Sequence, residues 1–251
     1  ILNFHKFNYL STVYLCFYLD GNEAVDEKLR QAINYAIDKP KMVKYMMNNM
    51  ATVANGGFIP KGLPGFNENA GYTYQPQKAR ELIQAYQKEK GKLPTIQLTT
   101  VQEYADVCEY IQAQLAKVGL NLEINVVPGP TMRDGKATGK FSFFRANWGA
   151  DYPDAENFLS LYYSKNFAPE GPNYSHFKNE KFDKLYTQSF QISDENEREK
   201  IYKQMDSLMM KSAPIVPLFY DQTSIFLRKN VKGFTMSPVK LLDLTRVYKT
   251  K

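Results

Sequence analysis

Apolar positions in the first fifty residues change from a strand-like to a helix-like spacing. Residues 12–19, TVYLCFYL, are apolar or aromatic on both alternating faces, which is typical of a strand covered on both sides of a sheet. After Asp26, apolar residues recur every three or four positions through 27–37, which predicts a helix with one buried face. Pro40 interrupts this spacing, and residues 41–50 resume it. The pattern therefore predicts an internal strand followed by two helices.

The middle of the chain contains the most regular pattern. Residues 55–74 are rich in Gly, Pro and Asn and lack periodicity, so they predict a long surface loop, and a helix that ends at Gly91 follows it. Strand-like positions at 95–101 and 122–127 flank helical spacing at 103–118. A strand, helix and strand of these lengths predict a crossover between two parallel strands, which we expect to be right-handed.

Strand-like positions return at 141–148, FSFFRANW, after the poorly periodic stretch GPTMRDGKATGK. Beyond them the spacing predicts three helices and then two strands, at residues 155–163, 179–190, 195–212, 214–220 and 223–229. The predicted fold class is therefore α/β, with a mixed sheet, one strand–helix–strand crossover and flanking helices.

The composition indicates a folded globular protein and narrows its partners. With 251 residues, 43% of them hydrophobic, the chain can bury a substantial core. Its 32 Lys and Arg exceed its 26 Asp and Glu, but they are scattered among the acids, which favours a solvated mixed surface over a nucleic-acid footprint. The 14% of aromatic residues suit a wide binding cleft. Together with the net charge of +6, they leave a nucleic-acid-binding module as an alternative.

Other features bear on cellular location. Cys16 and Cys108 lie in apolar surroundings and predict buried thiols rather than a disulfide framework. No apolar stretch approaches the roughly 18 residues that a membrane span needs, and the start lacks the basic region and cleavage site of a signal peptide. Because the first residue is Ile1 rather than Met, we expect that preceding residues have been removed, together with any targeting signal.

The segment NWGADYPDAENF, residues 147–158, carries the most distinctive chemistry. It follows a predicted strand, and ligands in open α/β sheets bind beyond the carboxyl ends of strands. Asp154 directly precedes a predicted helix, as an N-cap residue does. Asp151 cannot be the same cap because Tyr152 intervenes, so it is either a turn residue or a ligand contact. Trp148 is either a core residue or part of the same site.

An enzymatic function has weaker support. Hydrolysis of a glycosidic bond uses two carboxyl groups roughly 5 to 9.5 Å apart on opposite sides of the bond, whereas Asp151 and Asp154 would point from one wall. A hydrolase of peptides or glycans that uses this pair remains an alternative. His5 and His176 have no nucleophile or metal-ligand partner at a recognisable spacing, and there is no phosphate-binding glycine loop. The sequence therefore predicts no catalytic residue, no metal site and no cofactor.

Several segments, in their order along the chain, resemble the C-terminal half of the family 5 extracellular solute-binding proteins, which deliver cargo to ABC importers. These segments are YLCFYLD, DEKLRQAINYAIDKPKMV, IPKGLPGF, YQPQKARELI, LAKVGLNLEI, NWGADYPDAENF, NYSHFKNEKFDKLYTQS and VKGFTMSPVKLLDLTRVY. The resemblance covers nearly all of this chain but about half of a family member, because the part that forms most of the first lobe is absent.

The resemblance implies a receptor with two lobes that close about a hinge. Residues 1–221 would form the second ligand-binding lobe with its hinge strand, a lobe of the type II periplasmic-binding-protein kind, and 222–251 would return to the missing first lobe. The implied partners are a small peptide or similar solute, the membrane subunits of an ABC importer and the missing N-terminal lobe, with no nucleic acid. The implied location is the periplasm, or the cell surface as a lipoprotein.

The resemblance also implies roles for residues of the distinctive segment. Members with a W-x-x-D pattern hold the ligand's α-ammonium group on the Asp, which corresponds here to Asp151, and Trp148 would line a side-chain pocket. Arg145 matches a position that meets the ligand carboxylate in some oligopeptide binders. The chain differs from some dipeptide binders in having no Arg after TTVQEY, which argues against a dipeptide-only ligand.

The residue types agree with binding of a peptide. A buried ammonium group needs a desolvated carboxylate partner, and hydrogen-bonding groups with broad aromatic surfaces can accept many side chains. Tyr152, Asn173 and Tyr174 supply such groups close to Asp151 and Trp148 in our prediction. Because the family also carries nickel complexes, haem, sugars and opines, another small solute remains an alternative ligand.

Overall fold

A mixed sheet organises the fold of the computed structural model, which describes residues 2–21, 26–239 and 241–251. Within the described residues the sheet has six strands. In order across the sheet they are β2 (Ala51–Val53), β6 (Ile215–Arg228), β1 (Leu2–Phe17), β5 (Phe143–Gly149), β3 (Ile96–Thr100) and β4 (Leu122–Val126). The strand β3 runs parallel to β4 and β5, and the other neighbours are antiparallel. The predicted α/β class with a mixed sheet is confirmed.

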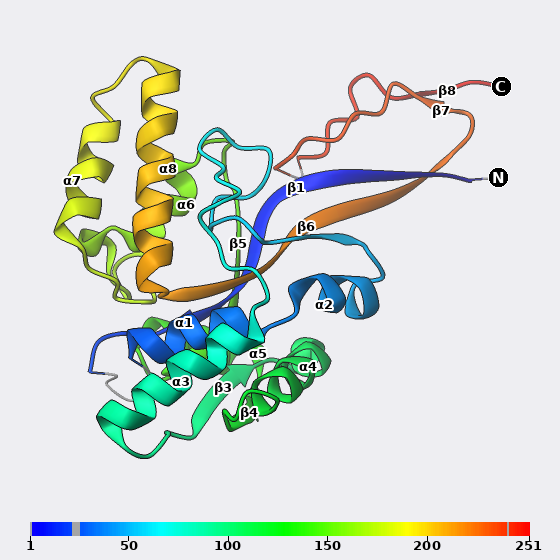
Figure 1. Cartoon of the computed structure of the whole chain (residues 1–251). Coiled ribbons are helices and arrows are strands. Elements are labelled where there is room, and N and C mark those ends of the chain that lie inside the picture. Colours follow the sequence, from blue (N-terminus) through cyan, green and yellow to red (C-terminus); the bar gives the residue numbers. More distant parts are fainter. Residues whose placement is uncertain (1, 22–25, 240) are drawn as a thin grey trace.

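Helices cover both faces of this sheet (Figure 1). One face is packed by α1 (Glu27–Ala36), α2 (Lys39–Met46), α3 (Pro76–Lys90) and α4 (Ala105–Ala116). The other is packed by α5 (Gly129–Ala137), α6 (Glu156–Leu159), α7 (Glu180–Ser189) and α8 (Glu195–Ser212). Short 3-10 turns lie at η1 (Gln102–Tyr104), η2 (Ser160–Tyr162) and η3 (Ser164–Asn166). Two hydrophobic cores result, one on each face of the sheet.

The predicted crossover is present. The strand β3 pairs in parallel with β4, with Ile96 opposite Leu122, and α4 connects the two strands. The helix buries Val107, Cys108 and Ile111 against the sheet, as its apolar spacing predicts. The carboxyl ends of β3 and β5 therefore lie at the same edge of the sheet, because these two strands are also parallel.

Capping residues explain several helix boundaries. Asp26 accepts a hydrogen bond from the Leu29 backbone N–H at the start of α1, and Asp38 caps α2 in the same way. Pro40 lies in the first turn of α2, where its missing N–H is tolerated, so it begins the second helix as well as ending the first. Asp194 caps α8, whose bounds match the predicted helix.

The two longest strands, β1 and β6, pair with each other in the middle of the sheet. Only the inner half of β1 is buried on both faces, and its outer half pairs with the outer half of β6, from Leu2 opposite Arg228. This two-stranded ribbon extends beyond the helices, and both chain ends lie toward its far end (Figure 1). The two strands predicted at 214–220 and 223–229 are thus one strand, and the predicted boundary between 221 and 222 falls inside it.

Three other expectations need correction. The stretch before β5 contains α5, which was missed because it buries only Met132 and Gly135 and so lacks an apolar stripe. The strand β2 was also missed, since it is three residues long. The helix predicted at 155–163 is divided into α6 and η2, because the chain tightens to 3-10 geometry at Ser160.

The C-terminal segment turns back along the ribbon. It contains the short antiparallel pair β7 (Val231–Lys232) and β8 (Tyr248–Lys249). The Leu10 N–H donates to the Pro238 carbonyl at 3.0 Å, and the Phe7 and Phe234 rings meet edge to face. Leu241, Leu242 and Leu244 of this segment are exposed. Lys240, which belongs to the predicted segment 222–251, lies outside the described residues.

Candidate functional site

The strand β5 carries the distinctive segment to the edge of the sheet. Its alternation places Trp148 on the face covered by α6 and α8, together with Ala146. Arg145 lies on the opposite face, beside Leu15 of β1 and the core packed by α1 and α4. The alternation along β5 therefore directs Arg145 and Trp148 to opposite faces of the strand, whereas the structure brings Trp148 and the following loop together.

Asn157 joins Trp148 to the loop that holds Asp151. The Trp148 indole Nε1–H donates to Asn157 Oδ1 at 2.9 Å, and the Asp151 backbone N–H donates to the same oxygen at 3.3 Å. Asn157 lies in the single turn of α6 and is 5% exposed. One buried oxygen thus accepts from both ends of the W-x-x-D pattern.

Asp151 is exposed at this edge of the lobe, close to the ribbon. The pKa of Tyr9 on β1 is raised by burial and further by the charges of Asp221 and Asp151, which places all three groups near one another. The Tyr9 ring also approaches Gly149 closely, since a Cβ at Gly149 would lie 2.1 Å from the Tyr9 hydroxyl. The Asp151 carboxylate therefore lies where the helix-covered part of the sheet meets the ribbon, and its side chain is open to solvent.

Asp154 is not the N-cap residue predicted from the sequence, because α6 begins at Glu156 and its N-cap is Ala155, but its side chain still bonds the start of this helix. Its Oδ1 accepts a hydrogen bond from the Glu156 N–H at 2.9 Å, and its Oδ2 lies 3.4 Å from Arg198 Nη2 on α8. The helix α6 begins one residue later than predicted. Asp154 is thus tied to the base of the loop, while Asp151 stands free at its tip.

Tyr152 is fixed from within the same loop. Its hydroxyl donates to Glu156, and Glu156 also accepts from the Tyr186 hydroxyl of α7. Burial raises the pKa of Tyr152, and the hydrogen bond to Glu156 raises it further. Nearly half of the Tyr152 surface remains exposed beside Asp151. The ring can therefore contact a ligand while its hydroxyl is held by Glu156.

Arg145 is held at the carboxyl end of β3. Its Cζ lies 3.3 Å from the centroid of the Tyr104 ring, and its Nη1 donates to Asn147 at 3.3 Å. Desolvation lowers the pKa of Arg145, and interactions with Tyr104 oppose this shift. The guanidinium is stacked on an aromatic face, an arrangement that orients it.

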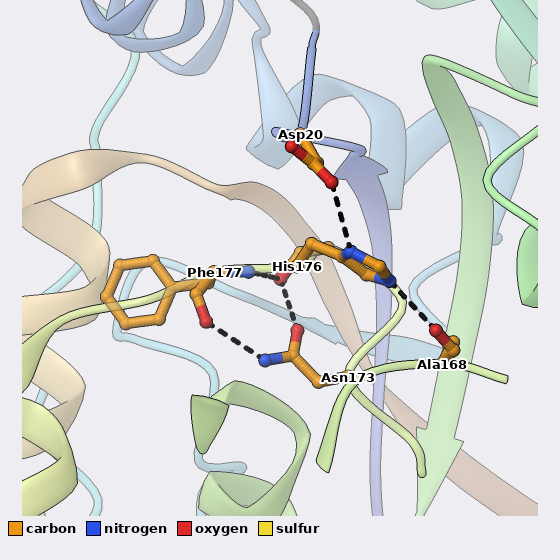
Figure 2. Close-up of polar contacts among 6 residues, drawn as sticks. Asp20, Ala168, Asn173, His176 and Phe177 are labelled. Atoms are coloured by element: carbon orange, nitrogen blue, oxygen red, sulfur yellow. Dashed lines mark hydrogen bonds and ion pairs between the residues drawn. The ribbon is translucent and has the colours of Figure 1, made fainter. Parts of the chain in front are cut away.

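Asn173, a predicted ligand contact, makes its hydrogen bonds within its own loop. Asn173 is fully buried, and its amide donates to the Tyr163 and Phe177 carbonyls while its oxygen accepts from the Ser175 hydroxyl. Figure 2 shows this amide directed at the Phe177 carbonyl. Asn173 therefore organises its own loop.

The neighbouring Tyr174 is half-buried and packs against the core on the α8 side of the sheet. Lys136 of α5 places its Nζ 5.3 Å from the centroid of the Tyr174 ring. The structure thus joins Tyr174 to α5. It lies on the same side of the sheet as Trp148, in a loop separate from the one that carries Asp151.

His176 belongs to the same loop and has a structural environment. Its ring stacks on Phe167 with a centroid distance of 4.5 Å, and its Nε2 lies 3.0 Å from the Ala168 carbonyl. The remaining nitrogen faces Asp20 at 3.9 Å (Figure 2). The ring is therefore occupied by packing and polar contacts at the edge of the sheet opposite Asp151.

The described residues contain neither a metal-binding cluster nor a membrane-spanning helix. Within residues 2–21, 26–239 and 241–251, no group of three or more His, Cys, Asp and Glu side chains could hold a metal ion. Over the same described part of the chain, no helix combines the length and the apolar character of a membrane span. Cys16 and Cys108 are both buried and unbridged, as predicted.

Sequence reasoning missed Asn157 and the separation of Arg145 from Trp148. Asn157 had a detectable signal, because it is a polar residue at a buried position of an apolar turn, between Glu156 and Phe158. The placement of Arg145 and Trp148 on opposite faces also had a signal in the sequence, because two residues three positions apart on a strand point to opposite faces.

Sequence comparisons relate this chain to solute-binding proteins. The sequence pattern of the family described as bacterial extracellular solute-binding proteins, family 5 Middle, matches residues 1–169. The dipeptide-binding protein of Escherichia coli K12 is 28% identical over 236 residues, which span 92% of this chain and 44% of that protein. The glutathione-binding protein GsiB of the same strain is 28% identical over 219 residues, which span 84% of this chain and 42% of that protein.

Solved structures show the same fold. HbpA2 from Haemophilus parasuis superposes with a TM-score of 0.86 at 26% identity, over 100% of this chain and 50% of that chain. The periplasmic binding protein DppA from Helicobacter pylori, solved in complex with the peptide STSA, gives a TM-score of 0.84 at 27% identity, over 100% of this chain and 49% of that chain. The chain thus spans about half the length of the relatives that it matches, and it belongs to family 5 of the bacterial extracellular solute-binding proteins.

Proposed function

We propose that this chain forms one wall of the ligand cleft in an extracytoplasmic receptor of an ABC importer, and that the ligand is a peptide. The observation that carries the proposal is the exposed Asp151 carboxylate at the carboxyl end of β5, with its backbone and Trp148 tied to Asn157. Relatives that bind dipeptides and glutathione support the ligand class.

The chemistry follows from closure of a second lobe over this wall. Asp151 would then lose its contact with water and need a cationic partner, which the α-ammonium group of a peptide supplies. Trp148 and the exposed face of Tyr152 offer apolar surface to the first side chains. Arg145, on the other face of the sheet, is proposed to meet a carboxylate that reaches the carboxyl end of β3, and Tyr174 to line the cleft further along.

The partners and the location are part of the same proposal. Residues 1–221 would act as the second lobe, and 222–251 would pack on a first lobe contributed by the same protein. The membrane subunits of an importer would receive the loaded receptor. Such a receptor works in the periplasm or on the cell surface as a lipoprotein, and nucleic acid is not among its proposed ligands.

We propose binding without catalysis. The Asp154 carboxylate bonds the Glu156 N–H and faces Arg198, so it supports the loop rather than a reacting bond. A hydrolase would need Asp151 and Asp154 to act on the same bond from opposite sides. Incubation with peptides and glycans should therefore give no turnover, and turnover that is lost in Asp151→Asn would contradict the proposal.

The decisive test is Asp151→Asn in a two-lobed receptor that contains this chain, with a tri- to pentapeptide as ligand. The substitution keeps the shape and removes the charge, which leaves a desolvated ammonium group without its partner. Losing one member of such a buried pair costs on the order of 3 to 5 kcal/mol, or about 200- to 5000-fold in affinity. Calorimetry measures the effect.

Two controls complete the cycle. The N-acetylated peptide has no ammonium group, so it should bind the wild type poorly and lose little further in Asp151→Asn. Asp154→Asn should change affinity and stability by less than about 1 kcal/mol, because Asn can also accept the hydrogen bond from the Glu156 N–H and a partly exposed ion pair with Arg198 contributes little. If acetylation and Asp151→Asn reduce affinity additively, Asp151 does not contact the ammonium group.

A further inference from the structure

Asn157 is unusual among the residues of the α6 turn. It is a polar side chain at 5% exposure, and the neighbouring Phe158 and Leu159 are fully buried apolar residues of the core. A buried amide persists in such surroundings when its hydrogen bonds are satisfied. The partners of its Oδ1 are therefore a guide to what the side chain does.

The two donors to Asn157 Oδ1 come from the W-x-x-D pattern. Trp148 Nε1 lies 2.9 Å from this oxygen and Asp151 N lies 3.3 Å from it. The first contact fixes the rotation of a large ring that is only partly buried. The second fixes the backbone at the residue whose carboxylate is exposed. A single atom therefore sets the orientation of the ring and the position of the acid relative to each other.

We infer that Asn157 is a positioning residue, which presets Trp148 and Asp151 in the geometry that receives a ligand's ammonium group and first side chain. The ligand part of this inference rests on the proposed function. Preset side chains need not be ordered on binding, so the entropic penalty of immobilising them is avoided. Asn157 itself is buried beneath the indole and needs no contact with the ligand.

A role in stability alone would predict something different. If Asn157 served only the core, its loss would lower the unfolding temperature but leave the folded Trp148 ring in place. The positioning role requires that Trp148 and the Asp151 amide change in the folded state. Trp148 is the single Trp in the sequence, so its fluorescence and its indole N–H resonance report on this one contact.

The experiment compares three variants of the 251-residue chain. Asn157→Leu has a similar volume and removes the acceptor, and Asn157→Asp retains an acceptor oxygen at the same place. Asn34→Leu is the matched control, since Asn34 is a buried amide of α1 that donates to the Arg30 and Ile215 carbonyls on the opposite face of the sheet. Readouts are acrylamide quenching and hydrogen exchange of the indole N–H, with the Asp151 amide resonance.

We expect the indole N–H of folded Asn157→Leu to exchange about fivefold faster or more, because the free-energy difference of one net hydrogen bond is about 1 kcal/mol or more. Quenching of Trp148 should rise and the Asp151 amide resonance should shift. Asn157→Asp should restore all three readouts toward wild type, and Asn34→Leu should leave them unchanged at a comparable loss of stability. If Asn157→Leu does not fold, Asn157→Ser withdraws the oxygen and serves in its place.

Unchanged Trp148 and Asp151 signals in a folded variant without the acceptor overturn the inference, and so does an Asn157→Asp variant that behaves like Asn157→Leu. In the two-lobed receptor, Asn157→Leu should weaken free peptide about tenfold and weaken the N-acetylated peptide less. An equal loss for both peptides contradicts the ammonium part of the inference. If wild-type receptor binds no peptide at all, the proposed function fails, whereas the indole readouts still decide whether Asn157 positions Trp148 and Asp151.

Discussion

Two buried ionisable side chains hold the start of the loop that follows β2. Asp206 of α8 accepts a hydrogen bond from the Phe58 N–H at 2.8 Å, and Lys39 of α2 donates to the Ala54 carbonyl at 2.9 Å. Burial raises the pKa of Asp206 to about 7 and lowers the pKa of Lys39 to about 7. Each charge is therefore unfavourable in the folded protein.

For Asp206 this shift makes stability depend on pH. The carboxyl titrates near 3.8 when unfolded and near 7 when folded, so its contribution is complete below 3.8 and is lost as the pH rises through 7. Asp206→Asn should remove this loss. The free energy of unfolding of the variant relative to wild type should be higher at about pH 8 than at about pH 4, by on the order of 2 to 4 kcal/mol. Denaturant unfolding at both pH values measures the difference. An equal effect of the substitution at both would show that Asp206 titrates normally.

Lys39 provides the opposite case. Its pKa falls from 10.5 to about 7 on folding, so its contribution is complete above 10.5 and is lost as the pH falls through 7. The stability of Lys39→Met relative to wild type should therefore increase as the pH falls from about 10 to about 7. Over the same range the relative stability of Asp206→Asn should change little. If both substitutions act in the same pH window, burial is not the cause of the two shifts.

Gly57 shows how tightly the Asp206 carboxylate is enclosed. A Cβ at this position would lie 1.8 Å from Asp206 Oδ2, which cannot retreat while Oδ1 is bound to Phe58. Gly57→Ala should lower the free energy of unfolding by about 1 to 3 kcal/mol through overpacking. Gly129→Ala is the control, because a Cβ there meets nothing within 4 Å. Equal stability of the two variants in thermal unfolding would argue against a close contact at Gly57.

At the scale of elements, the sequence predicted those helices and strands whose bounds depend on capping residues and on the local spacing of apolar positions. The bounds of α8 follow from Asp194 as a cap and a regular buried stripe, and the crossover of β3 and β4 follows from its three periodic segments. The outer half of β1 was missed because residues 2–9 have mostly exposed or half-buried side chains and lack the apolar run of a doubly covered strand. That half is fixed by pairing with a strand some two hundred positions away, which no local pattern contains.

The candidate site divides in the same way. The strand end, the hydrogen bond of Asp154 to the start of α6 and the exposure of Asp151 depend on residues within the segment 147–158. The hydrogen bonds of Asn173 depend on the carbonyls of Tyr163 and Phe177, which come close to its amide only in the folded loop. Such convergence is a tertiary property, so residue type alone did not predict these internal hydrogen bonds of Asn173.

The C-terminal segment gives a prediction at this scale. Residues 229–251 form one short strand pair and leave large apolar side chains exposed, whereas β3 and β4 are covered by α4. Amide hydrogen exchange in a dilute monomer should therefore find 229–251 the least protected described segment, and 95–126 among the most protected. Equal protection of both segments would show that the C-terminal segment is held by more than its visible contacts.

For the whole molecule, the proposed cleft has one wall in this chain. Asp151 and Tyr152 are exposed, so a peptide bound here alone would remain largely in water and its contacts would be weakened by solvation. We expect the isolated chain to fold and to bind peptide with a dissociation constant of about 1 mM or weaker. Calorimetry on the chain and on the two-lobed receptor gives the comparison, and micromolar binding by the chain alone would place the complete site within it.

The ribbon of β1 and β6 also determines how the lobe would respond to mechanical load. Its open end pairs Leu2 with Arg228, so a force applied between these two residues separates the paired residues of the two strands one after another. Near Thr12 and Tyr220 the ladder is flanked by β5 and β2, and the rungs there can no longer be loaded separately. A pulling experiment should record a soft extension followed by an abrupt rupture, with the transition at the register shift between Asn8 and Thr12.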